Sequence, residues 1–404
     1  MSRLTQSCLA VAAASLSVLL LAAQPASAQF SVGYSFGDSS SDASTPAANA
    51  HVVQDSAGNF YGLAELGGAH SKGAIYKIDP SGTETVLYSF TGGADGGKPQ
   101  GGLFLDTDGT LYGVTDSGGD TSCAISTAGC GTIFKFDTAG TLTTLHTFTN
   151  GADGAFPVGN LISVNGTLYG VAEDGPPKDN CSSCGLIFKI TKSGRFTEVY
   201  FFTGRNDGFG PNALVRDAAG NLYGAASFAG SSTLGTIFKL DTSENFTVLY
   251  TFTGGAAGST PTGRLIIDVN GNIHGTTEFG GDAFCNCGVV FRLDAAGDAK
   301  VLHVFKTNPQ GTTPQEGLID VGGVLYGTTS GGGDSACRPL SNGCGVLFEI
   351  GKTGQYSVLH TFTGASGDAG DGASALMLGS DGSIYGTTMA GGANSKGAFF
   401  KYTP

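Results

Sequence analysis

The sequence has no tryptophan, only three methionines and few charged residues. Asp, Glu, Lys and Arg together make up 13% of the chain, about half of the share usual in globular proteins. The formal net charge of −13 gives an acidic surface, which disfavours binding to nucleic acid or anionic lipid. The absence of tryptophan weakens a sugar-stacking surface without excluding it, because Tyr and Phe can also stack on sugars.

Motifs of known chemistry are also absent. The sequence contains no Gly-x-Ser-x-Gly nucleophile elbow, no His-Glu-x-x-His zinc motif and no phosphate-binding loop. No set of unlike polar residues stands out from the near-identical units described below. The sequence therefore indicates no catalytic residues, no metal site and no cofactor, apart from a Ca²⁺ site considered below.

The one long hydrophobic run lies near the N-terminus. Residues 9–23 are apolar, follow the basic Arg3 and precede the small residues Ala26-Ser27-Ala28. This order is typical of a secretory signal peptide, so we expect residues 1–28 to be removed on export, with cleavage near Ala28. The mature chain would be periplasmic or secreted. A transmembrane anchor is the alternative, but the run is short and rich in small residues.

Glycine is abundant. It accounts for 68 of 404 residues, about 17% against a usual share of about 7%. Hydrophobic residues make up 40% of the chain, too many for a disordered protein. The mature chain, residues 29–404, exceeds the length at which one core usually stops growing, about 250–300 residues. It must divide into domains or repeat a small unit, and glycine-rich turns favour a repeat.

An aromatic residue followed by glycine marks seven copies of one unit. The steps between copies are 51, 57, 54, 51, 52 and 59 residues, close to the periods of propellers and arrays. The copies are Tyr61-Gly62, Tyr112-Gly113, Tyr169-Gly170, Tyr223-Gly224, His274-Gly275, Tyr326-Gly327 and Tyr385-Gly386.

Two further landmarks repeat in the same order. The second is an aromatic before a mostly basic residue: Tyr76-Lys77, Phe134-Lys135, Phe188-Lys189, Phe238-Lys239, Phe291-Arg292, Phe348-Glu349 and Phe400-Lys401. The third is the Phe of a Tyr-x-Phe-Thr-Gly phrase: Phe90, Phe148, Phe202, Phe252, Phe305 and Phe362. Each unit therefore has the same internal order, and one description serves all seven.

The second unit has the periodicity of four strands. We expect strands over residues 102–106, 111–115, 132–137 and 142–149. The first and second strands, and the third and fourth, are joined by Asp-x-x-Gly turns, in which Asp bonds the main chain and Gly takes a positive φ. Such a sheet has two apolar faces, and stacking the sheets around an axis buries both.

The ends of the chain complete the seventh unit. This unit stops after its third strand at Lys401-Tyr402, and residues 32–37 match residues 86–92 of the first unit. We therefore predict an all-β, seven-bladed β-propeller over residues 29–404, whose last blade is closed by the N-terminal strand. Residues 37–50 are expected to be a flexible surface loop. The alternatives are an open solenoid or two smaller domains. The predicted blades span 48–92, 93–149, 150–203, 204–253, 254–306, 307–363, and 364–404 with 29–37.

The repeated phrases resemble the GloVer repeats, a tandem-repeat family of exported bacterial proteins of the Gloeobacter/Verrucomicrobia type. The resemblance rests on the Leu-Tyr-Gly-x-Thr, Gly-x-Ile-Phe-Lys-x-Asp and Val-Leu-Tyr-x-Phe-Thr-Gly phrases and covers nearly all of residues 31–404. It implies export and a repeat fold, and it brings no known activity and no catalytic residues. Relatives often carry a C-terminal surface anchor. This chain ends at Pro404 without one, so the resemblance implies a freely soluble protein.

Eight cysteines of the mature chain fall in four near-neighbour pairs, each between a second and a third strand. They are Cys123/Cys130, Cys181/Cys184, Cys285/Cys287 and Cys337/Cys344. In an exported protein we expect each pair to form a disulfide, the short Cys285/Cys287 separation being the least favourable. Two alternatives are a redox dithiol at Cys181/Cys184 and a four-cysteine zinc site shared by neighbouring blades.

The cysteine loops and the loops between blades should share one face of the ring. We expect this decorated face to bind a ligand, because loops on a rigid scaffold often carry function. Repeated acidic residues there could bind Ca²⁺ or a polyol, although each Asp-Gly could simply form its own turn. These residues are Asp95, Asp153, Asp207, Asp368 and Asp371, with Ala257 in the equivalent place of another loop.

Histidines add little. His146, His303 and His360 occupy the slot of Tyr88, Tyr200 and Tyr250, so aromatic packing explains them. The sequence thus favours an exported, monomeric binding scaffold for an extracellular glycan or protein, with no nucleic-acid partner and no membrane insertion. An exported propeller enzyme, such as a metal-dependent lactonase or a polysaccharide lyase, is the main alternative. A structural surface-layer component is a third.

Overall fold

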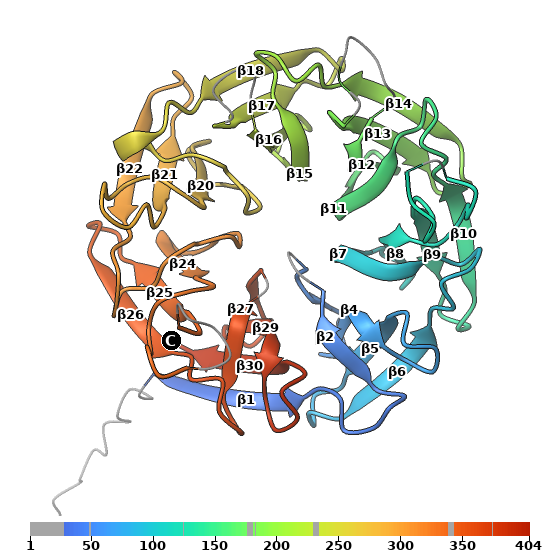
Figure 1. Cartoon of the computed structure of the whole chain (residues 1–404), viewed down its shortest axis with the longest axis horizontal. Helices are drawn as coiled ribbons and strands as arrows, with labels where there is room; N and C mark the ends of the chain where they lie inside the picture. The colour runs from blue at the N-terminus through green and yellow to red at the C-terminus, as the bar shows by residue number, and fades with distance from the viewer. Residues whose placement is uncertain are drawn as a thin grey trace, which may run out of the picture.

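The computed structural model describes residues 28–47, 50–123, 125–175, 181, 183–228, 234–337, 343–373 and 375–404, without the side chains of 371–373. Nearly all of the predicted signal peptide lies outside these residues. Within them, strands form seven antiparallel sheets arranged in a ring (Figure 1). The first strand of each sheet is nearest the axis and the fourth is on the outside. The all-β, seven-bladed propeller predicted from the repeat is confirmed.

The first four blades follow the chain from β2 onward. Blade one contains β2 (Ala43–Pro46), β3 (Val53–Gln54), β4 (Phe60–Gly67), β5 (Ala74–Ile78) and β6 (Glu84–Ser89). Blade two contains β7 (Gly97–Leu105), β8 (Leu111–Ser117), β9 (Thr132–Phe136) and β10 (Leu142–Thr147). Blade three contains β11 (Ala155–Val164), β12 (Thr167–Asp174), β13 (Leu186–Thr191) and β14 (Phe196–Phe201). Blade four contains β15 (Phe209–Arg216), β16 (Leu222–Phe228), β17 (Thr236–Leu240) and β18 (Phe246–Thr251).

The last three blades have shorter first strands. Blade five contains β19 (Ile266–Ile267), β20 (Ile273–Thr277), β21 (Val289–Leu293) and β22 (Ala299–Val304), preceded by the 3₁₀ turn η2 (Gly255–Ala257). Blade six contains β23 (Ile319–Val321), β24 (Val324–Thr328), β25 (Val346–Ile350) and β26 (Tyr356–Thr361). Blade seven contains β27 (Ala369–Ala373), β28 (Met377–Leu378), β29 (Ile384–Gly391), β30 (Ala398–Thr403) and the N-terminal β1 (Gln29–Ser35).

The N-terminal strand closes the ring. β1 pairs antiparallel with β30, with Val32 opposite Phe400. It becomes the outermost strand of the last blade, beside the C-terminus (Figure 1). Its partner edge on β30 is therefore paired rather than open. The predicted closure is confirmed.

Neighbouring blades are joined by the same aromatic contact at all seven joints. The Phe that directly follows each fourth strand packs against the aromatic of the third strand in the next blade, with ring centroids 4.9–5.7 Å apart. Such pairs add about 0.5–1.5 kcal/mol beyond the burial of their area. The pairs are Phe36–Tyr76, Phe90–Phe134, Phe148–Phe188, Phe202–Phe238, Phe252–Phe291, Phe305–Phe348 and Phe362–Phe400.

This contact explains the glycine of the first landmark. Gly113 lies opposite Phe134 across β8 and β9. A Cβ on Gly113 would lie 2.6 Å from Cζ of Phe134, so only glycine lets the ring lie flat across the neighbouring strand. The equivalent glycine has the same steric conflict in every blade. The first two landmarks are thus the two sides of one cross-strand contact.

A glycine and a proline meet at six of the seven joints. Gly131 has a φ of +91°, and a Cβ there would lie 2.7 Å from Cδ of Pro157 in the next blade. The residue before that proline, Phe156, donates its N–H to the carbonyl of Cys130 at 2.9 Å. The pairs are Gly397/Pro46, Gly73/Pro99, Gly131/Pro157, Gly185/Pro211, Gly235/Pro261 and Gly288/Pro314. The joint between blades six and seven has Gly345 but no proline opposite it.

The expected loop over residues 37–50 is wrong in part. Residues 43–46 form β2, which pairs with β4 and places Ala43 opposite Gly67. Ala43, Ala47 and Ala50 are buried. The segment is therefore the upper half of the first strand of blade one, and the sheet begins upstream of the predicted boundary at residue 48. The segment has small and polar residues and lacks the alternating apolar pattern from which a strand is predicted. It forms a strand because it pairs with β4.

All four predicted cysteine pairs form disulfides, with Cα atoms 5.1–5.9 Å apart. Each bridge joins cysteines of one blade, so the alternative zinc site shared by two blades does not form. In a chain stabilised by local bridges, the longer loops are closed into small rings. The bridges are Cys123–Cys130, Cys181–Cys184, Cys285–Cys287 and Cys337–Cys344.

The second cysteine of each bridge lies deeper than a loop on an exposed binding face would place it. Cys184 and Cys344 are each only 2% exposed. Cys184 packs in the apolar cluster between blades three and four, and Cys344 in the one between blades six and seven. A bridged sulfur is apolar, so these two sulfurs cover the end of the core and are shielded from solvent. Burial of Cys184 also argues against the redox dithiol, which needs an accessible thiolate.

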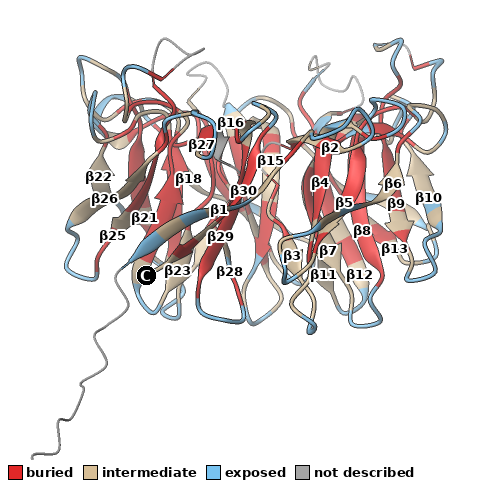
Figure 2. Cartoon of the chain, turned by 90° about the horizontal axis from the view of Figure 1, so that it is seen from below, coloured by how far each residue is buried: buried red, intermediate tan, exposed pale blue. Residues whose placement is uncertain are grey.

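The two faces of the ring differ (Figure 2). On the upper face of Figure 2, the loop after a second strand lies beside the loop that enters the same blade. Gly119 N donates to Gly93 O at 2.8 Å in blade two, and Gly281 N donates to Gly255 O at 2.8 Å in blade five. The lower face carries the tight Asp-x-x-Gly turns. Among the described residues, no helix is long and apolar enough to cross a membrane.

Candidate functional site

The predicted acidic residues of the upper face are bonded within their own loops. Asp207 is buried and accepts from the Tyr200 hydroxyl at 3.0 Å, the Thr203 N–H at 2.7 Å and the Thr203 hydroxyl at 2.7 Å. Asp95 accepts from Tyr88 and from the main chain and hydroxyl of Thr91 in the same way.

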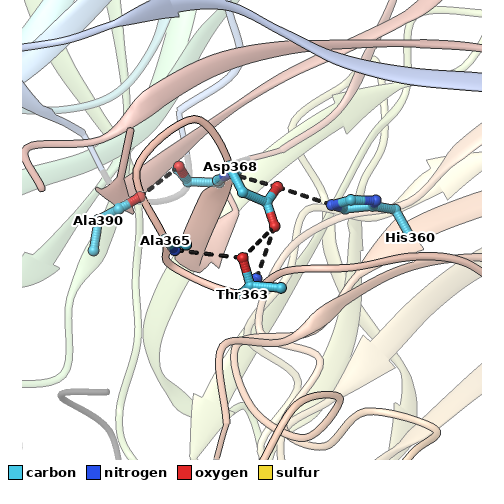
Figure 3. Close-up of polar contacts among 7 residues, drawn as sticks. His360, Thr363, Ala365, Asp368 and Ala390 are labelled. Atoms are coloured by element: carbon cyan, nitrogen blue, oxygen red, sulfur yellow. Dashed lines mark hydrogen bonds and ion pairs between the residues drawn. The ribbon is translucent and has the colours of Figure 1, made fainter. Parts of the chain in front are cut away.

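A histidine replaces the tyrosine in two of these loops. Asp368 accepts from Thr363 N–H at 2.9 Å and lies 2.9 Å from His360 Nε2 (Figure 3). Asp153 lies 3.1 Å from His146 Nε2 and accepts from the Thr149 hydroxyl at 2.6 Å. Burial would raise the pKa of the Asp153 carboxyl, but the hydrogen bonds from His146 and Thr149 outweigh it and hold that pKa below its usual value.

These four carboxylates serve four separate loops. Each carboxylate already accepts at least three hydrogen bonds, which leaves little capacity for a shared ligand. Among the residues that the structure describes, no three His, Cys, Asp or Glu side chains form a group able to hold a metal ion. The side chain of Asp371, the fifth predicted residue, lies outside the described residues.

The predicted packing role of the histidines is confirmed. The ring of His146 stacks on Phe196 at 4.0 Å, and the ring of His303 stacks on Tyr356 at 3.9 Å. His360 stacks on Phe30 of β1 at 3.7 Å. Tyr200 makes the same contact with Phe246 at 3.8 Å. The slot therefore requires a flat ring with a polar edge, which either residue provides.

Unlike polar residues meet instead at the axis. We define the axial position as the residue before the buried apolar residue of each first strand, for example the residue before Leu265. It varies strongly between otherwise similar blades. From blade one to blade seven it is His51, Gly102, Asn160, Ala213, Arg264, Gly317 and Ala375.

Each of the two largest axial side chains lies against a glycine of the next blade. A Cβ on Gly102 of blade two would lie 2.6 Å from Nδ1 of His51 in blade one. A Cβ on Gly317 of blade six would lie 3.0 Å from Cβ of Arg264 in blade five. Gly102 therefore leaves the space that the His51 ring occupies, whereas Gly317 allows the close approach of the Arg264 backbone.

His51 and Arg264 come from blades that are not neighbours, yet they act on each other. Burial, together with the charge of Arg264, lowers the pKa of His51 to about 3. The imidazole is therefore neutral at physiological pH. Burial also lowers the pKa of the Arg264 guanidinium, although both side chains are only half-buried by accessible surface. Such residues lie deep in the molecule but can still be reached by solvent.

Several buried polar atoms of this region have no hydrogen-bond partner among the residues that the structure describes. They are His51 Nδ1, Asn212 Oδ1, Thr262 Oγ1 and Arg264 Nε. We call His51, Asn212, Thr262 and Arg264 the axial set. The amide of Asn212 in blade four donates to the carbonyl of Pro261 in blade five at 2.8 Å, which fixes it beside Thr262. Unsatisfied buried groups of this kind are uncommon and point to a functional role.

Acidic residues lie where several second strands end, on the upper side of the ring. They follow the first landmark by four residues and are Glu65, Asp116, Glu173 and Glu278. Burial raises the pKa of Asp116, with a further contribution from Glu65 that Lys98 opposes. Burial likewise raises the pKa of Glu278, which accepts from Gln315 of blade six at 3.0 Å. A ligand approaching the axis from this face would pass these carboxylates.

The sequence also indicates the axial position, through the variation of that residue between otherwise similar blades. The repeat draws attention to positions at which the blades agree, whereas the axial position is one at which they differ. Aligning the units on the buried residue of the first strand exposes His51 and Arg264 at once. Their convergence, however, depends on ring closure, which brings blades one and five around a common axis.

Two surface cavities lie away from the axial set. One, of about 540 Å³, lies on the upper face between blades five and six and is lined by Phe279, the Cys285–Cys287 loop and Thr312, among others. The other, of about 390 Å³, lies by the lower turns of blades three and four and includes Tyr169 and Glu244. Neither is lined by a residue of the axial set.

Solved structures with a similar fold include extracellular sensor domains and a lactonase-like protein. The extracellular domain of BT4673 from B. thetaiotaomicron, described as a one component system, is 13% identical with a TM-score of 0.59, and the match covers 92% of this chain and 39% of that one. The extracellular domain of BT3049, described as a hybrid two component system, is 11% identical with a TM-score of 0.55, covering 93% and 41%.

A protein from Bacteroides uniformis described as a 6-phosphogluconolactonase is 14% identical with a TM-score of 0.52, covering 80% of this chain and 86% of that one. The chain spans about two fifths of the length of the two sensor domains. At these identities the similarity shows the propeller fold alone. A search of the curated proteins found no match.

The repeat itself identifies the family. The model of the Gloeobacter/Verrucomicrobia repeat matches residues 18–204 and 178–400. The two matches together cover most of the chain and contain all three landmarks in most blades. The chain therefore belongs to the Gloeobacter/Verrucomicrobia repeat family.

Proposed function

We propose that this protein is an exported propeller scaffold that binds an extracellular ligand, a glycan or another extracellular molecule, at its axial set. The observation that carries the proposal is the break in the repeat at the axial position. A purely structural position would keep one residue type in all blades, as the joint aromatics do. His51 and Arg264 instead differ from blade to blade, lie deep near the axis and leave polar atoms unpartnered.

Export is supported by the cysteines and the family. Four disulfides are typical of a chain that folds in an oxidising compartment. The apolar run at residues 9–23 has the form of a signal peptide. We expect the mature chain to act as a monomer, because pairing of β1 with β30 already closes the ring without a second copy.

An exported enzyme is the second candidate, and His51 is the observation in its favour. A neutral imidazole whose Nδ1 has no partner among the described residues could accept a hydrogen bond or a proton from a substrate hydroxyl, although its lowered pKa makes it a weak base. Lactone opening and polysaccharide cleavage are the reactions we would test first. Turnover of either substrate class that is abolished by His51→Ala would favour the enzyme over the scaffold.

The test compares two histidine variants of the mature chain on an array of glycans and small extracellular metabolites. His51→Ala removes a member of the axial set, whereas His70→Ala removes an exposed histidine of the upper face. We expect ligands of the wild type to bind His51→Ala at least about tenfold more weakly and His70→Ala unchanged. Binding that survives His51→Ala would contradict the proposal. Metal analysis of the same preparation tests the Ca²⁺ expectation.

A further inference from the structure

We propose that the cavity between blades five and six on the upper face binds a neutral oligosaccharide, with Phe279 as the surface on which a sugar ring stacks. The cavity has a volume of about 540 Å³, within the range of about 300–1,000 Å³ that is usual for small-ligand sites. It lies apart from the axial set and is therefore a second site, beyond the proposed function.

The described residues that line this cavity carry no charge. Blade five contributes the loop of the Cys285–Cys287 bridge, and blade six contributes its entry loop and the loop after its second strand. The polar side chains of the lining are amides and hydroxyls, which both donate and accept hydrogen bonds and match the hydroxyl groups of an uncharged sugar. These side chains are Asn286, Thr307, Asn308, Thr312, Thr313 and Ser335.

This part of the ring lacks the aspartate that the repeat places on the upper face. The residue equivalent to Asp153 is Ala257 in blade five and Gln310 in blade six. The main-chain carbonyl of Gln310 accepts from the Tyr356 hydroxyl, which holds the entry loop of blade six without a carboxylate. Two consecutive blades therefore lack this negative charge where the cavity lies.

The acidic residues nearest to the lining along the chain are engaged in other bonds. Asp282 and Asp334 each accept a main-chain N–H of their own loop at 2.8 Å, and Glu278 accepts from Gln315 at 3.0 Å. No lining residue that the structure describes is a cation, and the formal net charge of −13 repels anionic ligands. A neutral ligand fits these surroundings best.

Phe279 provides an aromatic surface at the cavity wall. Its side chain is 38% exposed, and Phe284, which precedes the lining residue Cys285, is fully exposed. Exposed aromatic residues gathered in one loop mark interaction sites more often than singly scattered ones do. One face of a pyranose ring carries C–H groups that pack on an aromatic ring, while its hydroxyls project from the edge toward polar partners.

The polar groups of the wall are held in place by the protein itself. Asn286 Oδ1 accepts from the Gly280 N–H at 2.6 Å, which fixes its amide. The main-chain N–H of Thr313 donates to the Cys287 carbonyl at 2.9 Å. Among the described residues, the amide nitrogen of Asn286 and the hydroxyl of Thr312 make no hydrogen bond. Fixed groups with free capacity lower the entropic cost of binding a ligand.

An extended peptide is a less suitable occupant. Phe279 exchanges main-chain hydrogen bonds with Ser259 at 2.9 and 3.2 Å. Thr312 exchanges them with Gly331 at 2.8 and 3.1 Å. Addition of a peptide strand needs free main-chain donors and acceptors, and these wall positions have already paired theirs.

The test is titration of the mature chain with the neutral trisaccharides maltotriose, cellotriose and laminaritriose, and with trigalacturonate as an anionic counterpart. Saturation-transfer NMR detects binding, and calorimetry gives the Kd. We expect at least one neutral trisaccharide to bind, and to bind Phe279→Ala at least about tenfold more weakly than the wild type. Trigalacturonate should bind more weakly than that trisaccharide.

Phe228→Ala is the matched control. Phe228 has the same place in blade four, five residues after the aromatic of the first landmark, as Phe279 has in blade five. It is 40% exposed and does not line the cavity, so its removal should leave trisaccharide binding unchanged. Phe279→Tyr keeps a ring at the wall and should retain binding.

A second variant tests the polar wall without removing an aromatic residue. Asn286→Asp keeps an acceptor for the Gly280 N–H but replaces the amide donors with a charge. It should weaken binding of the neutral trisaccharide while the thermal unfolding curve stays that of the wild type. Unchanged binding in both Phe279→Ala and Asn286→Asp would overturn the inference.

Two further results would also overturn it. One is the absence of binding by any neutral trisaccharide; if the apolar dye ANS then binds in a manner that depends on Phe279, the cavity is an apolar docking surface instead. The other is binding of trigalacturonate that is as tight as that of the neutral trisaccharides, because an uncharged wall gives an anion no advantage.

His51→Ala separates this cavity from the axial set. Trisaccharide binding that is lost in His51→Ala but kept in Phe279→Ala would overturn the cavity inference and leave the axial scaffold standing. Binding that is lost in Phe279→Ala and kept in His51→Ala assigns that sugar to the cavity. The glycan array is then repeated in the Phe279→Ala background, in which His51→Ala again reports on the axial set alone.

Discussion

At the scale of single residues, the residues that repeat in every blade differ from those that we propose bind a ligand. Asp95, Asp153, Asp207 and Asp368 recur because the same loop recurs, and each is bonded to the threonine and the aromatic or histidine of its own loop. The sequence pointed to these residues and offered two roles for them, ligand binding or formation of their own turns. The axial set was missed because each of its members occurs once.

The loop of blade five allows the role of these aspartates to be tested by addition. Ala257 stands where the other loops have Asp, while Tyr250 and Thr253 provide the same donors as Tyr88 and Thr91. Ala257→Asp should therefore raise the free energy of unfolding by about 1.5–3 kcal/mol, the usual net value of a hydrogen bond to a charged group. Urea-induced unfolding measures the change.

Ala256→Asp is the matched control for that experiment. It adds the same charge one residue earlier, at an exposed position from which the carboxylate does not replace Asp95 of the equivalent loop. We expect it to leave stability unchanged or slightly lower, because the chain is already acidic. Equal stability of the two variants would show that the repeated aspartates do not hold their loops.

At the scale of elements, the joints between blades carry the most specific packing. The sequence predicted the strands because turns with Asp and Gly separate runs rich in Thr, Tyr, Phe and Val. It did not predict β2, whose residues 43–46 lack an apolar pattern, nor the meeting of Gly131 with Pro157, since neither partner is near the other along the chain. Contacts of this kind become visible only when the blades are placed side by side.

Gly131 and Gly140 form a matched pair for testing a joint. Both have a positive φ, of +91° and +84°. A Cβ on Gly140 meets nothing within 4 Å, whereas one on Gly131 would lie 2.3 Å from the Thr115 carbonyl oxygen of its own blade and 2.7 Å from Cδ of Pro157 in the next. Gly140→Ala should cost about 1–2 kcal/mol, the effect of an unfavourable backbone conformation alone. Gly131→Ala should cost a further 1–3 kcal/mol or so from overpacking.

Chemical denaturation of both variants checks this difference. Gly131→Ala should also increase hydrogen exchange in β9 and in β11, on the two sides of its joint, whereas Gly140→Ala should affect only its own turn. If the two substitutions destabilise the protein equally, the contact between glycine and proline contributes nothing to the joint.

At the scale of the whole molecule, the two chain ends depend on each other. Closure was predictable from sequence because the last unit lacks its fourth strand and residues 32–37 supply a copy of it. The structure adds that Phe36 and Tyr76 then form the seventh aromatic joint, at 4.9 Å. This joint therefore requires both termini, because Phe36 follows β1 and β1 pairs with the C-terminal β30.

Deletion of residues 29–37 should therefore open the ring. It removes β1, exposes the edge of β30 and takes Phe36 from its joint. An unpaired edge strand recruits other chains, so we expect the shortened protein to form oligomers in light scattering after size exclusion. A peptide of residues 29–37 added in excess should restore the behaviour of the full mature chain.

Phe36→Ala is the control for that deletion. It keeps the paired strand but removes one ring from a buried contact, which should cost about 3–5 kcal/mol of stability without causing oligomers. If the deleted protein has the same size in solution as the full mature chain, the edge of β30 is not held by β1 alone.

The glycines beside His51 and Arg264 also restrict how such a ring can diversify. The ring of His51 fills the space that Gly102 leaves empty, so a larger residue at position 102 would collide with it. If every large axial residue needed a small one in the next blade, large residues could occupy only alternate blades. In a ring of seven blades, at least one pair of neighbours would then both have small axial residues. Selectivity at the axis would therefore depend on a few large side chains, and the small residues between them are needed to make room.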